Sequence, residues 1–296
     1  MHSNSATSEA TTGAATRTVT GLRATATGAI TAIDSHAHVF RRGLPLAPVR
    51  RHAPDYDALL ADYLALLDAH AVSHAVLVQP SFLGTDNRFL LDALRVCPQR
   101  LRGVAMVEPT AGEDELALLA EAGVCGIRLN LVGLPIPDFA RAEWQGLFAR
   151  VRALDWHVEL HRESRDLASA AEPVLDAGCK LVVDHFGRPE VAQGAGDEGF
   201  DWLLRASISG RVWVKLAAAY RSWPEERGTA AREAAQALLQ AFGAGRLVWG
   251  SDWPNTQHQE VADYASTHAA LADWVPDAAE RQRILVDTPS RLFHFI

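Results

Sequence analysis

The sequence has few cysteines, no long hydrophobic run and no excess of positive charge. Its three cysteines, Cys97, Cys125 and Cys179, lie far apart without C-x-x-C spacing, which indicates neither a disulfide framework nor a structural zinc site and fits a reducing cytoplasm. No run reaches the roughly 18 apolar residues that a membrane-spanning helix needs. The net charge of -8 argues against a nucleic-acid or anionic-membrane surface. A small molecule is therefore the expected partner.

The first 28 residues lack both apolar periodicity and the hydrophobic core of a signal peptide. They consist mainly of Ala, Thr, Ser and Gly with scattered Arg. This composition predicts a disordered low-complexity tail at residues 1–28, with a transit-like segment as the alternative. Residues 29–296 show no second change of composition, so we expect them to form one domain.

Short β-branched or apolar runs alternate with Ala- and Leu-rich stretches of helical spacing from Ile30 onward, which is the pattern of repeated βα units. Eight runs occur: one ending at residue 38, then 74–81, 101–109, 124–131, 156–162, 180–189, 212–221 and 246–255. Eight parallel strands joined by crossover helices predict a closed (β/α)8 TIM barrel. No glycine-rich phosphate-binding fingerprint follows any run, which removes the usual signature of the open-sheet alternative.

Polar residues gather at the ends of these runs, and in such a barrel all strand ends meet at the face where active sites lie. The set is His36, His38, Ser81, Glu108, Arg128, Asn130, Glu159, His161, His185, Tyr220, Arg221 and Asp252. A purely structural barrel would not gather four histidines and an aspartate there. Asp252 stands out because a carboxylate in so apolar a neighbourhood needs a specific reason.

Most of the other polar residues are interpreted as structural, with roles in ion pairs, in packing or at the surface. We expect Glu159 to be an interior partner for Arg128 or Lys215, and Lys215 to form a structural ion pair. Arg188, in the loop after the sixth run, is left open between substrate contact and a surface position. The remaining histidines, at positions 52, 70, 74, 157, 258, 268 and 294, are assigned to surface or packing.

Two chemistries fit the strand-end set. Imidazoles and a carboxylate could hold a divalent metal whose bound water is acidified. Alternatively, the histidines could donate hydrogen bonds to a developing oxyanion while Asp252 takes a proton from water, without any metal. Both routes lead to hydrolysis.

Five ordered motifs resemble the amidohydrolase superfamily branch that contains 2-pyrone-4,6-dicarboxylate lactonase. They are Ile33-Asp34-Ser35-His36-Ala37-His38, Val78-Gln79-Pro80-Ser81 with Gly84-Thr85-Asp86-Asn87, Gly126-Ile127-Arg128-Leu129-Asn130, Asp184-His185-Phe186-Gly187-Arg188-Pro189 and Gly250-Ser251-Asp252-Trp253-Pro254. The resemblance extends over about residues 30 to 295. It implies a (β/α)8 barrel that hydrolyses a lactone ester, but the motifs do not fix the substrate.

The resemblance also implies roles for single residues. Asp252 would be the general base for water, with His36, His38 and His185 around the scissile carbonyl. Arg128 and Arg221 would hold a substrate carboxylate, because a planar guanidinium suits two-pronged binding. Ser81, Thr85 and Asn87 would add hydrogen bonds, and His161 and Tyr220 complete the expected substrate-binding set.

The same resemblance bears on cofactors. No lysine stands at the end of the fourth run to bridge two metals; Arg128 is there instead, so we expect no binuclear centre. A metal is dispensable in the lactonase relatives, and we expect no required cofactor. If one zinc ion is bound, the expected ligands are His36, His38, His161 and Asp252.

One departure from the dicarboxylate lactonase pattern concerns the substrate. Basic residues follow the strand-four arginine in that pattern, whereas this chain has the apolar stretch Leu131-Val132-Gly133-Leu134-Pro135. This predicts a lactone with one carboxylate, or a sugar lactone, ahead of the pyrone dicarboxylate. Two alternatives stay open: a mononuclear zinc-dependent decarboxylase or hydratase acting on an aromatic or dienoic acid, and a non-catalytic barrel. A monomer and a homodimer are both compatible with the sequence.

Overall fold

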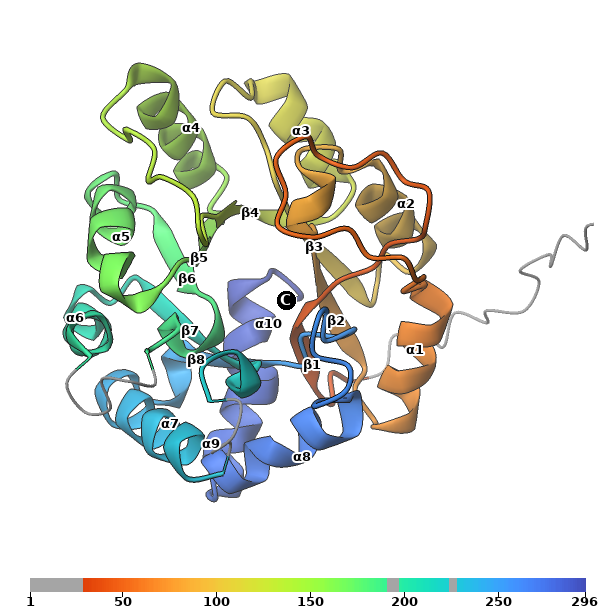
Figure 1. Ribbon diagram of the computed structural model, residues 1–296, viewed down its shortest axis with the longest axis vertical. Helices are drawn as coiled ribbons and strands as arrows, with labels where there is room; N and C mark the ends of the chain where they lie inside the picture. Colours follow the sequence, from red (N-terminus) through yellow and green to blue (C-terminus); the bar gives the residue numbers. More distant parts are fainter. Residues whose placement is uncertain (1–28, 191–196, 224–227) are drawn as a thin grey trace, which may run out of the picture.

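The computed structural model describes residues 29–190, 197–223 and 228–296, and the predicted tail at residues 1–28 lies outside them. The predicted (β/α)8 TIM barrel is confirmed: eight parallel strands pair in chain order inside a ring of helices (Figure 1). The strands are β1 (Ile33–Ala37), β2 (His74–Val78), β3 (Leu101–Ala105), β4 (Val124–Asn130), β5 (His157–His161), β6 (Lys180–Val183), β7 (Val212–Ala217) and β8 (Leu247–Gly250).

The last strand meets the first through hydrogen bonds just beyond β8. The backbone nitrogen of Asp252 donates to the carbonyl of His36 at 2.8 Å, and that of His38 donates to the carbonyl of Trp253 at 2.8 Å. Gly250 allows this approach, because a Cβ atom there would lie 2.9 Å from the backbone nitrogen of His36. Closure therefore brings the ends of β1 and β8 side by side.

The helices of the described residues are α1 (Leu60–Ala69), α2 (Arg88–Val96), α3 (Glu113–Glu121), α4 (Ala142–Ala153), α5 (Leu167–Asp176), α6 (Glu198–Ala206), α7 (Thr229–Phe242), α8 (Tyr264–Trp274), α9 (Ala278–Gln282) and α10 (Thr288–Leu292). The sequence pattern did not predict α6, whose nine residues include a glycine, a weak helix former. Gly199 is nevertheless required, because its Cβ would lie 1.8 Å from the carbonyl oxygen of Ser164. None of the described helices has the length and apolarity to cross a bilayer.

Several predicted strands were too long, including the run 74–81, because β2 ends at Val78. β3 ends at Ala105, β6 at Val183 and β7 at Ala217, and the polar residues that follow belong to loops and short 3-10 turns, including Ala219–Arg221. Pairing between neighbouring strands stops where the chain turns outward to reach the next helix. The polar residues expected on strands therefore lie mostly on the loops directly above them.

Two apolar regions hold the barrel together. The larger lies between the sheet and the surrounding helices, with buried residues such as Leu64, Leu94 and Leu238. The smaller lies inside the barrel, where Ile33, Val104 and other strand residues pack with Leu292 and Phe293. Figure 1 shows α10 across the middle of the ring, so this last helix closes one end of the barrel.

Candidate active site

A register shift in β1 aims two histidines into the barrel. Ile33 packs in the interior cluster, and strict alternation from it would turn His36 outward. The pairing of β1 with β2 shifts between Asp34 and Ala37, which reverses the alternation. His36 and His38 consequently share one interior face, with their ring centroids 4.9 Å apart.

Asp252 faces these two imidazoles from the loop after β8. Its Oδ2 accepts hydrogen bonds from the Tyr220 hydroxyl at 2.6 Å and from the Arg221 Nε at 2.8 Å. Its Oδ1 has no hydrogen-bond partner among the described residues and lies 3.6 Å from His36 Nε2 and 3.7 Å from His38 Nε2. One oxygen is therefore fixed and the other is free for chemistry.

The Asp252 carboxyl is buried, yet it is ionised. Burial alone would raise its pKa, but Arg221 and the nearby imidazoles hold the pKa well below its ordinary value. The residue has a φ of 57°, in the left-handed region that non-glycine residues rarely adopt. The surrounding hydrogen bonds therefore hold both the charge and a strained backbone in place.

His161 and His185 extend the imidazole cluster across the barrel. The ring centroid of His185 lies 4.8 Å from those of both His36 and His161. Burial lowers the pKa of His185 to about 3, with Asp252 and Asp184 acting in the opposite direction. Burial also holds the pKa values of His36 and His161 well below their usual range. These three rings are therefore neutral near pH 7.

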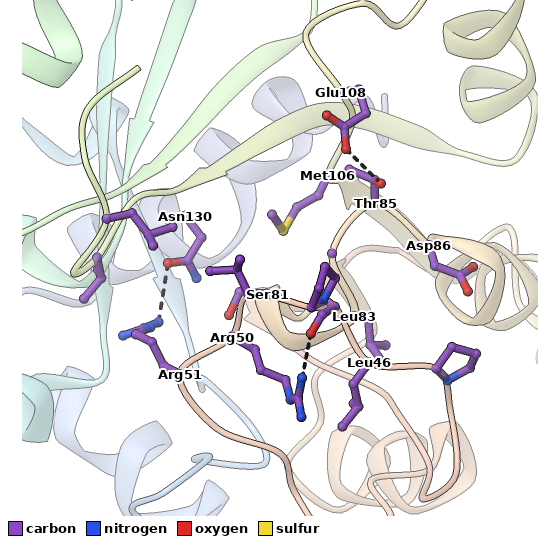
Figure 2. Close-up of a pocket in the computed structure, with 17 residues that line it drawn as sticks. Leu46, Arg50, Arg51, Ser81, Leu83, Thr85, Asp86, Met106, Glu108 and Asn130 are labelled. Carbon is purple, nitrogen blue, oxygen red and sulfur yellow. Dashed lines mark hydrogen bonds between the residues drawn. The ribbon is translucent and has the colours of Figure 1, made fainter. Parts of the chain in front are cut away.

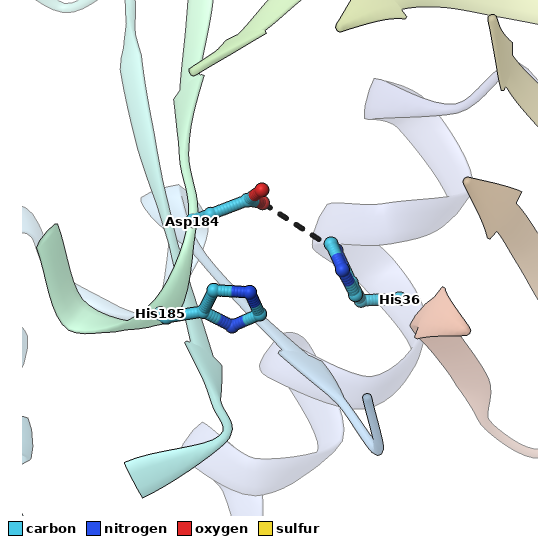
Figure 3. Close-up of side chains that lie close together, drawn as sticks. All are labelled: His36, Asp184 and His185. Carbon is cyan, nitrogen blue, oxygen red and sulfur yellow. Dashed lines mark ion pairs between the residues drawn. The ribbon is translucent and has the colours of Figure 1, made fainter. Parts of the chain in front are cut away.

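A buried charge network lies beneath the imidazoles. The Lys215 ammonium donates to Glu159 Oε2 and lies 3.4 Å from Asp184 Oδ1. Arg128 reaches Asp184 Oδ2 at 2.9 Å through Nη2 and Glu159 Oε1 at 3.2 Å through Nε. Glu159 thus pairs with both of its predicted partners, and Lys215 forms its predicted ion pair. Figure 3 shows the Asp184 carboxylate directed at His36, with His185 beside it.

Hydrogen bonding sets the two β1 histidines in opposite tautomers. Lys215 Nζ donates to His36 Nδ1 at 2.9 Å, so the proton of this neutral ring is on Nε2, facing Asp252. His38 Nδ1 lies 2.8 Å from the Val78 carbonyl and must donate to it, so in the neutral form of this ring Nε2 carries the lone pair. His36 therefore presents a donor to the site and His38 an acceptor.

The same hydrogen bonds decide how well the site suits a metal. Ligand atoms of His36, His38 and Asp252 lie within 4.8 Å of one another, and so do those of His36, Asp184 and His185; the expected fourth ligand, His161, belongs to neither group. His36 Nε2 carries a proton, and Arg128 and Lys215 engage Asp184. Since a catalytic zinc takes about three protein ligands, these side chains as hydrogen-bonded do not fit one.

Two adjoining cavities open above this cluster. The inner cleft has a volume of about 40 Å³ and is lined by His38, Arg51, His52, Pro80, Ser81, Phe82, Arg128, Asn130, His161, His185, Arg221, Asp252, Thr256 and Gln257. The outer cavity, about 480 Å³, shares Arg51, Ser81 and Asn130 with it (Figure 2). His52, expected at the surface or in packing, is thus at the cleft.

The predicted substrate-binding residues divide between these places. Ser81, Arg128, Arg221 and His161 line the inner cleft, whereas Thr85 lines only the outer cavity and donates its hydroxyl proton to Glu108 at 3.3 Å. The other two predicted residues, Asn87 and Tyr220, already form hydrogen bonds within the protein. The Asn87 amide bonds the backbone of Thr85 and Met106, and the Tyr220 hydroxyl bonds Asp252.

Two residues of the site were not predicted as functional from the sequence. Asp184 is a carboxylate directly after a buried strand, like Asp252, and this position is the signal that could have identified it. Arg51 lies in the long segment between β1 and α1, where no local pattern marks it. Its Nη2 donates to Asn130 Oδ1 at 3.4 Å, and it has no carboxylate within ion-pair distance in the part of the chain that the structure describes.

A family model described as amidohydrolase matches residues 33–295. The chain belongs to the amidohydrolase family. Within it, this amidohydrolase is 33% identical over 283 residues to a 2-pyrone-4,6-dicarboxylate hydrolase of Comamonas testosteroni, covering 88% of this chain and 90% of that protein. It is 32% identical over 275 residues to a 4-sulfomuconolactone hydrolase of Rhizobium radiobacter, with coverages of 89% and 90%.

A solved structure is also similar to this amidohydrolase. It comes from Pseudomonas putida and is named as a candidate 2-pyrone-4,6-dicarboxylic acid hydrolase. It shares 50% sequence identity, has a TM-score of 0.85, and the match covers 90% of this chain and 98% of that one. The superfamily branch indicated by the five motifs is thereby confirmed.

Proposed function

We propose that this amidohydrolase is an ester hydrolase that opens a small, carboxylate-bearing lactone. One observation carries the proposal. The free Oδ1 of the buried, ionised Asp252 lies 3.6 Å from His36 Nε2, whose ring accepts from Lys215 through Nδ1, and 3.7 Å from His38 Nε2, whose ring donates to Val78 through Nδ1. The curated relatives, whose names describe lactone hydrolysis, support the same reaction.

The geometry suits activation of one water molecule. Asp252 Oδ1 and His38 Nε2 are both acceptors, so together they can take both hydrogens of a water held between them. As the water oxygen attacks the lactone carbonyl, one proton passes to Asp252. The reaction needs no metal-bound hydroxide, in agreement with the poor fit of the side chains to zinc.

The imidazole donors face the charge that develops on the carbonyl oxygen. His36 Nε2–H would donate to this oxyanion, and His185, which is neutral near pH 7, adds a second donor. When the tetrahedral intermediate collapses, the bond to the ring oxygen breaks and the proton held by Asp252 passes to that oxygen. The product is an open-chain hydroxy acid.

Cations around the inner cleft favour an acidic substrate. Arg128 and Arg221 are already paired with Asp184 and Asp252. Arg51 has no such partner among the described residues, and burial together with neighbouring arginines lowers its pKa to about 10. Arg51 stays charged near pH 7. A substrate carboxylate bound beside it would therefore offset the repulsion between Arg51 and the neighbouring arginines. Arg188, whose pKa is lowered by burial and by Arg221, adds positive charge nearby.

The proposal includes a cytoplasmic enzyme, a small-molecule substrate, no nucleic-acid or membrane partner, and a monomer or homodimer. The net charge of -8 supports the choice of partner, and the free Cys97, Cys125 and Cys179 agree with a reducing compartment.

The test is a hydrolysis screen over mono- and dicarboxylate lactones and sugar lactones, run with and without chelator. Aromatic and dienoic acids are included for the lyase alternative. We expect a lactone with one carboxylate, or a sugar lactone, to open faster than the pyrone dicarboxylate, with no effect of chelator. Failure to open any lactone, with zinc-dependent release of carbon dioxide from an aromatic acid, would overturn the proposal.

A further inference from the structure

The inner cleft is the smaller of the two adjoining cavities. Its volume is about 40 Å³, against about 480 Å³ for the outer cavity. Asp252 lines the inner cleft and not the outer cavity, so the reacting carbonyl and the attacking water belong in the inner cleft. A substituent on the lactone ring then has the outer cavity as its adjoining space.

The outer cavity is the adjoining space. It shares Arg51, Ser81 and Asn130 with the inner cleft, and its volume of about 480 Å³ is within the range of small-molecule pockets, about 300 to 1,000 Å³. Figure 2 shows the Arg51 side chain directed at Asn130 along one side of it. A ligand can therefore occupy both cavities past these shared residues.

The free surface of the outer cavity is mostly apolar. Leu46, Val49, Leu83, Met106, Val132 and Leu134 line it. Three of these are large hydrophobic side chains with unusual exposure: Leu46 at 38%, Val49 at 72% and Leu134 at 38%. Large apolar side chains that stay exposed around one cavity indicate a binding surface.

Several polar groups of the outer cavity, in contrast, already have partners. Arg50 Nη1 donates to the Ala47 carbonyl at 2.9 Å, and the Thr85 hydroxyl donates to Glu108 at 3.3 Å. Asp86 pairs with Arg88 at 2.6 Å. Neither Arg50 nor the shared residue Arg51 has a carboxylate partner among the described residues, and of the two only Arg51 also lines the inner cleft. The ligand that matches this surface has an acidic group near Arg51 and an apolar group farther out.

We propose that the outer cavity binds an alkyl or aryl substituent of the lactone substrate. This inference rests on the proposed function and deepens it. The substrate class becomes a carboxylate-bearing lactone with an apolar arm, whose carbonyl enters the inner cleft. The apolar stretch after β4, which includes Val132 and Leu134, then forms part of the specificity surface.

The test is a series of carboxylate-bearing lactones with the same ring and alkyl arms of zero, two and four carbons. Burial of one CH2 group corresponds to about 0.8 kcal/mol, or about a fourfold change in kcat/KM. We expect kcat/KM to rise up to about fourfold with each added carbon. Calorimetry with the ring-opened hydroxy acids gives a second readout that needs no catalysis, and affinity should rise in the same order.

Two variants locate the effect. Leu134→Ser is expected to lower the gain in kcat/KM per added carbon to less than twofold. Met106→Gln, which keeps the side-chain length, should act in the same direction. The matched control is Leu118→Ser, because Leu118 is also an exposed leucine, at 65%, but lies on α3 away from the cavity lining. It should behave as wild type.

The outcomes separate the two proposals. Hydrolysis at a rate independent of arm length, with equal affinities for the ring-opened acids, would overturn the role of the outer cavity and leave lactone hydrolysis intact. Binding that strengthens with arm length, without hydrolysis of any lactone, would support the cavity and overturn the proposed function. A loss of the arm effect in Leu118→Ser as large as in Leu134→Ser would also contradict the assignment.

Discussion

Replacement of Lys215 by methionine should abolish most of the activity without any change in a residue that lines the inner cleft. The Lys215 side chain is fully buried, and its ammonium lies 2.9 Å from His36 Nδ1 and 3.4 Å from Asp184 Oδ1. Methionine has nearly the same length but can donate no hydrogen bond. The Lys215→Met change therefore removes the donor that keeps the His36 proton on Nε2.

Without this donor, we expect the proton of the neutral His36 ring to move from Nε2 to Nδ1. Asp184 Oδ1 lies 3.4 Å from His36 Nδ1 and can accept a hydrogen bond from this nitrogen when it carries the proton. Once Nδ1 is protonated, the neutral ring has no donor for the developing oxyanion. Loss of one such donor costs about 10²- to 10³-fold in kcat.

The same change also affects stability. Removal of one partner of a buried ion pair costs about 3 to 5 kcal/mol. Burial and Asp184 already raise the pKa of Glu159 to about 7 against the opposing charges of Lys215 and Arg128. Without the lysine, Glu159 takes up a proton at neutral pH, which leaves no unpaired charge. We therefore expect a loss near the lower end of that range.

Steady-state kinetics, thermal denaturation and zinc titration together test this reasoning. A destabilised but otherwise normal enzyme would lose melting temperature alone. A tautomer switch predicts, in addition, a kcat lower by at least about 10²-fold and tighter zinc binding, because His36 Nε2 gains a free lone pair. Activity within threefold of wild type, or unchanged zinc affinity in a folded variant, would refute the assigned role of Lys215.

Two further predictions concern the barrel and its buried imidazoles. Gly250→Ala should lower the free energy of unfolding by about 1 to 3 kcal/mol and lower kcat, because the new Cβ would lie 2.6 Å from the Cβ of His36. Chemical denaturation and steady-state kinetics measure these effects. The control is Gly245→Ala, because a Cβ at that position would have no atom within 4 Å. Burial lowers the pKa values of His157 and His185 to about 3, whereas the unfolded chain takes up these protons near pH 6.5. Stability should therefore fall by about 1.4 kcal/mol per histidine between about pH 7.5 and pH 5.5, and a flat melting temperature over this range would contradict the assignment.

The sequence allowed prediction of those parts of the fold that depend on local patterns. Periodicity located all eight strands, and the rule that strand ends share one face brought His36, His38, His185 and Asp252 together in advance. Strand ends were less well predicted, because pairing between neighbours, which local composition does not encode, decides where β3 and β6 stop.

Residues whose roles depend on distant contacts could not be predicted from local patterns. Arg51 comes from a long loop and reaches the cleft only because that segment folds over the barrel. The position of His36 depends on a register shift in β1, and its tautomer on Lys215 from β7, a strand far from β1 in the sequence. Such features arise from tertiary packing, so they become visible only when the strands are closed into a ring.

The most direct test of the account is kcat of Asp252→Asn on the best lactone substrate. The amide keeps the size of the side chain and its contact with Arg221 but cannot take a proton from water. We predict a loss of about 10³-fold in kcat, with the affinity for the ring-opened acid within a few-fold of wild type. A variant that retains more than about a tenth of wild-type kcat would contradict the assignment of Asp252 as the base.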